Sequence, residues 1–254
     1  DRADVSRDQW DSIITPEMEL RPELVARGIS LSKYPQLSVS YTAFNMEDPV
    51  VGGNKKLRQA LSCAFDSIQW KEFQNGRMMI PNGPVPPGVA GHSEKDPPYP
   101  FDLERARRLL AEAGYPEGKD PATGRRLQLT LELGGADNPE TRQSAELMAS
   151  FMERIGVVLE PSYNNWPALI KKIESRQAQM FSLTWLVDYP DAQNFLQLFA
   201  GENASPGPNR SNYHSEEFDR LYRAMVALPD SPEREVLCQA ATAALGQDVV
   251  VIAV

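Results

Sequence analysis

The chain has 254 residues, of which 41% are hydrophobic, and its 35 acidic and 26 basic residues give it a formal net charge of -9. This size and composition allow one large domain or two small ones with a proper hydrophobic core. A net negative charge repels phosphate backbones, and no apolar run approaches the roughly 20 residues that span a bilayer, so the sequence predicts neither a nucleic-acid partner nor a membrane-spanning helix.

The cysteines and histidines give no indication of a metal or cofactor site. Cys63 and Cys238 are too few for a disulfide framework and lack metal-type spacing. His92 and His214 are too few for a histidine-rich site and are expected in loops or at the surface. The first residues, DRADVSRDQW, have no signal-peptide pattern, which leaves open a cytosolic protein or a trimmed part of an exported one.

Residues 1–45 are predicted to form an initial segment that ends in a half-buried strand, because Leu37, Val39 and Tyr41 alternate with polar residues. A helical part follows at residues 54–115. Asn54 is a typical N-cap for a helix over 55–66, whose apolar stripe should be buried: Leu57, Leu61, Ala64 and Phe65. Its polar side chains are expected to face water: Lys55, Lys56, Arg58 and Gln59.

Residues 76–100 are rich in proline and glycine, which is typical either of a long ordered loop or of a linker between domains. Composition alone leaves both possibilities open. The next signal is a helix that begins at Asp102 as its N-cap and ends at Gly114, because glycine readily adopts the left-handed conformation that closes a helix.

A repeated strand and helix pattern over residues 126–200 predicts the fold class. Leucines alternate with polar residues from 127 to 133, Asn138 and Pro139 open a helix that Gly156 ends, and residues 157–160 read as a second strand. Another helix starts at Asn165 before the strand over 181–187. This βαβαβ order predicts an α/β fold with a central, mostly parallel β-sheet flanked by helices.

The tail, residues 213–254, is predicted to contain two helices and a final strand. Ser215 and Ser231 are the expected N-caps, and the apolar run VVVIAV at residues 249–254 has strand length. A buried strand with nothing after it leads us to expect that the natural chain continues beyond this sequence.

The exit of the strand over 181–187 is the candidate binding site, because ligands of open α/β sheets are held at the carboxyl ends of the strands. Aromatic and acidic side chains gather there, with one amide, and would suit a ligand with an apolar body and a cationic end, such as a peptide amino terminus. The candidate binding residues are Trp185, Asp188, Tyr189, Asp191 and Asn194. The competing interpretation is equally open at this point: the two aromatic residues could belong to the core, and the aspartates could only cap a helix.

Two other functional classes are weighed. Asp188 and Asp191 could act as paired carboxylates in a hydrolase, but the sequence has no nucleophile motif, phosphate loop or metal-ligand cluster to complete such a site, so no enzyme is predicted. A protein-interaction domain, with the acidic surface or the proline-rich loop as its interface, is the remaining alternative.

Several segments also resemble a known family. In order along the chain they are YTAFNMEDP, NKKLRQALSCAFD, NGPVPPG, YPFDLERARRLLAEAGYPEG, WLVDYPDAQNFLQLF, NYHSEEFDRLYRAM and SPEREVLCQAATAAL. Together they are similar to the peptide/opine/nickel family of extracellular solute-binding proteins that supply ABC importers, and the resemblance covers nearly the whole chain.

The resemblance implies that residues 1–254 form the carboxyl-terminal lobe of a two-lobe protein with the type II periplasmic-binding-protein fold, without the amino-terminal lobe. It also implies a monomer in the periplasm or outside the cell, with a lipid anchor as one option, that delivers its ligand to an ABC transporter permease and contacts the membrane only indirectly. The implied ligand is a peptide or similar small solute, with sugars and nickel chelates as alternatives. Asp188 falls where peptide-binding members place an aspartate that pairs with the α-amino group of the ligand.

Overall fold

The computed structural model describes residues 10–15, 19–32, 36–135 and 138–254. The chain divides into two compact units, one of residues 1–36 and 67–80, the other of residues 37–66 and 81–254. The described part of the first unit contains three short helices: α1 (Trp10–Ile13), α2 (Pro22–Val25) and α4 (Ser67–Phe73). The predicted helical part, residues 54–115, therefore contributes to both units.

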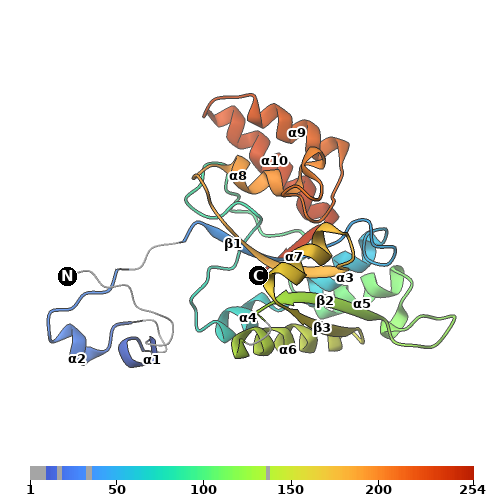
Figure 1. Cartoon of the computed structure of the whole chain (residues 1–254), viewed down its shortest axis with the longest axis horizontal. Coiled ribbons are helices and arrows are strands. Elements are labelled where there is room, and N and C mark those ends of the chain that lie inside the picture. The colour runs from blue at the N-terminus through green and yellow to red at the C-terminus, as the bar shows by residue number, and fades with distance from the viewer. Residues whose placement is uncertain (1–9, 16–18, 33–35, 136–137) are drawn as a thin grey trace. The chain divides into compact units, whose positions relative to one another are not determined.

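The second unit is built on a five-stranded sheet in the order β3-β2-β4-β1-β5 (Figure 1). The strands are β1 (Ser38–Phe44), β2 (Gln128–Gly134), β3 (Val158–Asn164), β4 (Met180–Leu186) and β5 (Val251–Ala253). Strand β2 pairs in parallel with β3 and β4, which confirms the predicted βαβαβ core. Strand β1 is the exception, since it pairs antiparallel with both β4 and β5.

The helices of the second unit start where polar capping residues predict them to start. They are α3 (Lys55–Ala64), α5 (Leu103–Glu112), α6 (Pro139–Glu153), α7 (Trp166–Glu174), α8 (Ala192–Leu196), α9 (Glu216–Val226) and α10 (Pro232–Asp248), with the 3-10 turns η2 (Pro116–Gly118), η3 (Gln197–Phe199) and η4 (Gly201–Asn203). In each of the seven helices the N-cap side chain accepts a backbone N–H: Asn54, Asp102, Asn138, Asn165, Asp191, Ser215 and Ser231. Such a cap is worth about 1 kcal/mol.

The two faces of the sheet are covered by different helices. Successive residues of a strand point to opposite faces, and the ring of Tyr41 packs against Phe199 of η3, whereas the neighbouring Thr42 Oγ1 donates to Met148 Sδ of α6. One buried cluster joins Tyr41 to apolar residues of α7, α8, α9 and α10. In Figure 1, α8, α9 and α10 accordingly gather at the top of the view and α6 lies at the bottom.

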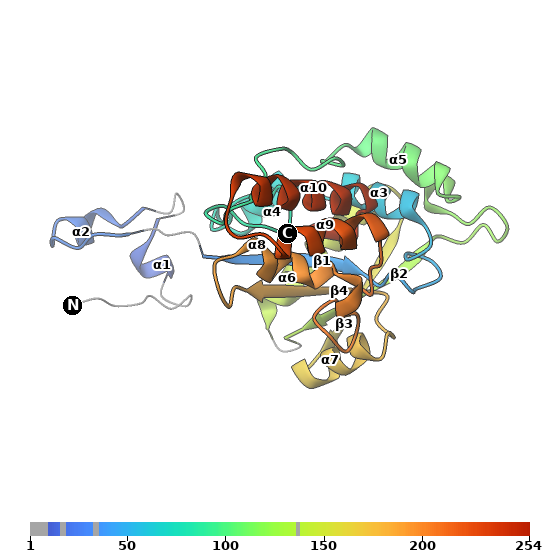
Figure 2. The same ribbon diagram turned by 90° about the horizontal axis from the view of Figure 1, so that it is seen from above.

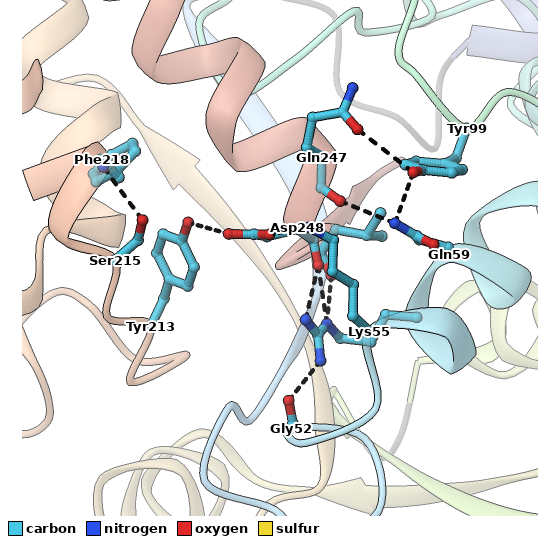
Figure 3. A network of polar contacts seen from close by, with 11 residues as sticks. Gly52, Lys55, Gln59, Tyr99, Tyr213, Ser215, Phe218, Gln247 and Asp248 are labelled. Carbon is cyan, nitrogen blue, oxygen red and sulfur yellow. Dashed lines mark hydrogen bonds and ion pairs between the residues drawn. The ribbon is translucent and has the colours of Figure 1, made fainter. Parts of the chain in front are cut away.

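The prediction that Arg58 and Gln59 face water is wrong. Arg58 is 3% exposed, and its guanidinium donates to four main-chain carbonyl oxygens, those of Val51, Gly52, Asp248 and Val249. Beside it, the Asp248 carboxylate at the end of α10 accepts from Lys55 and Tyr213, both at 2.6 Å (Figure 3). The partners at the end of α10 lie about 190 residues away in sequence, so a helical pattern around Arg58 cannot reveal them.

The proline- and glycine-rich segment passes from the first unit, at residues 76–80, into the second, where it is an ordered loop from Pro81 onward. Its residues lie along α10: a Cβ on Gly91 would meet Cys238, the His92 carbonyl oxygen accepts from Gln239, and Pro98 packs against Gly246. Val85 and Val89 are part of the buried cluster. We call residues 81–100 the strap. In Figure 2, α10 lies higher in the view than α8 and than strands β1 and β4.

Candidate functional site

The predicted site residues are brought together by the turn between β4 and α8. Because β3, β2 and β4 are parallel, their carboxyl ends meet at one edge of the sheet, and residues 187–191 leave the sheet there. Trp185 is half-buried, Asp188 and Tyr189 are exposed, Asp191 is half-buried, and Asn194 is fully buried. The turn therefore presents one acidic and one aromatic side chain outward.

Asn194 is the centre of a hydrogen-bonded group within this turn. Its Oδ1 accepts from Trp185 Nε1 at 2.8 Å and from the Asp188 backbone N–H at 3.3 Å, while its Nδ2 donates to Asp188 Oδ2 at 3.2 Å. The indole ring and the carboxylate are thus held by the same side chain. Sequence spacing placed these residues near one another but gave no sign of this arrangement.

Asp191 is held from inside the protein. Its Oδ1 accepts from the Gln193 N–H at 2.7 Å, which caps α8, and from Arg234 Nη2 of α10 at 2.7 Å. Burial raises the pKa of the Asp191 carboxyl, but the hydrogen bonds from Arg234 and Gln193 outweigh it, and the pKa lies below its ordinary value. The capping role that the competing interpretation gave to both aspartates therefore describes Asp191.

Asp188 differs from Asp191 in its surroundings. Its carboxylate is exposed, no ion pair joins it to a cation within the part of the chain that the structure describes, and its side chain accepts from Asn194. Tyr189, 44% exposed, and Leu186, 57% exposed, add apolar surface beside it. An unpaired carboxylate next to aromatic and aliphatic surface favours a ligand that is partly apolar and carries a cation.

A surface hollow of about 480 Å³ lies elsewhere, on the outer side of α7, and none of the predicted residues lines it. Its lining is Trp166, Pro167, Ile170, Lys171, Glu174 and Ser175. Trp166, 59% exposed, begins α7 directly after β3, so it stands at the carboxyl edge of the same parallel strands. The sequence analysis missed this tryptophan, although its place directly after a strand and the helix cap Asn165 was a usable signal.

Two negative findings apply to the described residues. No group of three or more histidine, cysteine, aspartate or glutamate side chains among them could hold a metal ion. None of the helices in the ranges given above is long and apolar enough to cross a membrane.

Comparisons with known proteins agree with this architecture. The family model of bacterial extracellular solute-binding proteins, family 5 Middle, matches residues 4–207. Heme-binding protein A of Haemophilus influenzae is 31% identical over 211 residues, which cover 82% of this chain and 37% of that protein.

Solved structures of other proteins share the fold of this chain. HbpA2 from Haemophilus parasuis has a TM-score of 0.79 at 28% identity and covers 92% of this chain and 46% of its own. The dipeptide binding protein from Pseudoalteromonas sp. SM9913, in complex with Met-Leu, has a TM-score of 0.77 at 27% identity. The match covers 87% of this chain and 43% of that protein. The chain thus spans less than half the length of these relatives. It belongs to the bacterial extracellular solute-binding proteins of family 5, as the resemblance of its sequence predicted.

Proposed function

We propose that this chain is part of the substrate-binding component of an ABC importer and that it binds the amino terminus of a peptide through Asp188. The observation that carries the proposal is the exposed Asp188 carboxylate, which has no described cation beside it and lies next to Trp185 and Tyr189. A protonated α-amino group would make a charge-assisted hydrogen bond there, and the aromatic surface would contact the first side chain.

The structural relative in complex with Met-Leu supports a peptide ligand, and family membership supports a binding protein rather than an enzyme. We further propose that residues 1–254 form the carboxyl-terminal lobe of a two-lobe protein outside the cytoplasmic membrane, which closes over the ligand and delivers it to a permease. The relatives are more than twice as long as the segment that they share with this chain, which leaves room for a second lobe.

Heme is the second candidate ligand, because the relative at 31% identity is named a heme-binding protein. The exposed Tyr189 hydroxyl could ligate iron. The Asp188 carboxylate, however, would repel the propionate groups of heme, and this favours the peptide. Titration with hemin, followed by the heme absorbance band, separates the two candidates.

The test of the peptide proposal is calorimetric titration of the full natural chain with the dipeptide Met-Leu and with N-acetyl-Met-Leu. We expect Asp188→Asn to weaken Met-Leu binding roughly tenfold to several hundredfold, since a charge-assisted hydrogen bond is worth about 1.5 to 3 kcal/mol. N-acetyl-Met-Leu, which lacks the cation, should bind weakly to both proteins. Equal affinity of the native protein for the two dipeptides would overturn the assignment of Asp188.

The 254 residues alone are expected to fold but to bind Met-Leu only weakly, because the proposed second lobe supplies the other wall of the site. Circular dichroism and the same titration check both parts of this expectation. Tight binding by these residues alone would contradict the two-lobe proposal.

A further inference from the structure

Asn194 was predicted to contact the ligand, but its side chain is 0% exposed and lies behind the turn. Three hydrogen bonds use it: two to its Oδ1, from the Trp185 indole and the Asp188 backbone, and one from its Nδ2 to Asp188 Oδ2. A ligand on the outer surface therefore meets Trp185 and Asp188, not the amide that holds them.

The direction of the Asn194 amide is fixed by these partners. Both groups that face Oδ1 are N–H donors, so Oδ1 has to be the acceptor, and Nδ2 is then turned toward the Asp188 carboxylate. Asp188 is exposed, and no hydrogen bond or ion pair among the described residues uses its other carboxylate oxygen.

Asn194 itself stands on a fixed support. It lies in the first turn of α8, whose cap Asp191 is held by the buried Arg234, and the preceding Ala192 is fully buried close to Gly91 of the strap. A side chain that is anchored in this way loses little freedom when a ligand binds to the groups that it holds.

We infer that Asn194 is a positioning residue, which sets the orientation of the Asp188 carboxylate and of the Trp185 ring for the ligand. The inference rests on the proposed function and extends it from the contacting groups to the group that orients them. Without Asn194, the carboxylate of Asp188 can rotate away and the indole N–H loses its acceptor.

The test compares Asn194→Ala with a matched control, Asn209→Ala, in the full natural chain. Asn209 is also 0% exposed, but it bonds to the Ala200 and Tyr213 carbonyl oxygens in a loop outside the candidate site. Both variants should be less stable, so stability alone does not distinguish them. The distinguishing quantity is the ratio of affinities for Met-Leu and N-acetyl-Met-Leu, which Asn194→Ala should lower about tenfold or more and Asn209→Ala should leave unchanged.

A double-mutant cycle shows whether Asn194 acts through Asp188. Asn194→Ala should cost less affinity in an Asp188→Ala background than in the native protein, since the carboxylate that it orients is already absent and only the Trp185 ring still depends on it. Additive losses would overturn the inference, as would an equal change of the affinity ratio in the Asn209→Ala control. If Asn194→Ala does not fold, Asn194→Ser replaces it, because the serine side chain is too short to make all three hydrogen bonds of the asparagine.

Nuclear magnetic resonance gives a readout that needs no ligand. The chain has 4 tryptophans, and the indole N–H resonance of Trp185 should shift in Asn194→Ala and stay in place in Asn209→Ala. An unchanged Trp185 resonance would overturn the positioning role. If the native protein binds neither dipeptide, the proposed function fails, and this measurement still decides whether Asn194 holds the turn.

Discussion

Arg234 Nη2 lies 2.7 Å from the Asp191 carboxylate, although the two residues are 43 positions apart in the sequence. The other nitrogens of this buried guanidinium donate to the Met225 carbonyl oxygen at 3.3 Å and to the Asp230 carboxylate at 3.2 Å. One side chain therefore connects the start of α8 with the end of α9. The charge of Asp191 is satisfied within the protein, whereas that of Asp188 faces outward.

Asp191→Asn should therefore affect stability rather than binding. The substitution keeps an acceptor for the helix cap but removes the charge that Arg234 requires, and we expect the free energy of unfolding to fall by about 1.5 to 3 kcal/mol. Asp188→Asn, at an exposed position, should change it by less than about 0.5 kcal/mol. Urea denaturation measures both, and a larger loss in Asp188→Asn would contradict these roles.

The contribution of Asp191 to stability should depend on pH. Its pKa lies below the ordinary 3.8 in the folded protein, so the stabilisation is complete at pH values above 3.8 and is lost as the pH falls through the folded pKa. The difference in unfolding free energy between the native protein and Asp191→Asn should accordingly shrink below about pH 4. A difference that stays constant across that range would show that the charge is not involved.

Replacement of Arg58 tests the hydrogen bonds that its guanidinium donates to main-chain carbonyl oxygens near the end of α10. Arg58→Met leaves the buried carbonyl oxygens of Val51, Gly52 and Val249 without their donor, and we expect a loss of at least about 3 kcal/mol. Lys55→Met is the control, because Lys55 is half-exposed and its ion pair with Asp248 should contribute less than about 1 kcal/mol. Thermal unfolding of the two variants checks the contrast, and similar losses would refute it.

Buried tyrosines predict a loss of stability in alkali. Burial raises the pKa of Tyr41 and of Tyr222 from 10.0 to about 12. Their contribution to the free energy of unfolding is complete below pH 10, where the unfolded tyrosines are still neutral. It is lost as the pH rises from about 10 to about 12. Unfolding free energies at increasing pH should therefore fall in this range, and they should fall less steeply in Tyr41→Phe and Tyr222→Phe.

Gly91→Ala tests whether the strap packs tightly against α10. Gly91 has φ of +89°, and a Cβ there would come within 2.6 Å of the Cys238 Cβ. Gly114 has a similar φ of +95° with no atom within 4 Å of such a Cβ, so Gly114→Ala carries the same backbone strain without the collision. We expect Gly91→Ala to be less stable than Gly114→Ala by about 1 to 3 kcal/mol, and equal stabilities would argue against close packing.

The features that were predicted correctly from the sequence are those that depend on residues close together in the chain. Asn54, Asp102 and Asn165 cap the helices that they were expected to cap, because a capping side chain bonds to a backbone N–H within a few residues. The alternating leucines of β2 are buried as predicted. The βαβ order was sufficient for the parallel core, since the crossover rule operates on consecutive elements.

The failures involve partners that are distant in sequence. The alternation of leucines with polar residues gives no sign that Glu132 of β2 is buried, where its carboxylate accepts from Asn164 at 2.7 Å and from Lys172 at 2.8 Å. The prediction that Arg58 faces water was wrong for the same reason, since its partners near the end of α10 are distant in sequence. Within the candidate site, spacing placed Asp188 and Asp191 on one turn but could not distinguish them, because the difference comes from Arg234 on a later helix.

The place of β1 in the sheet has a consequence for the order of folding. Ser38 of β1 pairs with Leu186 and Tyr41 pairs with Ala253, so this strand lies between two neighbours that are made much later during synthesis. Pairings of such long range require large loops to close and slow the folding of a chain. While the chain emerges from the ribosome, β1 has no strand partner until β4 is made, and its apolar face is exposed to chaperones or to aggregation during that interval.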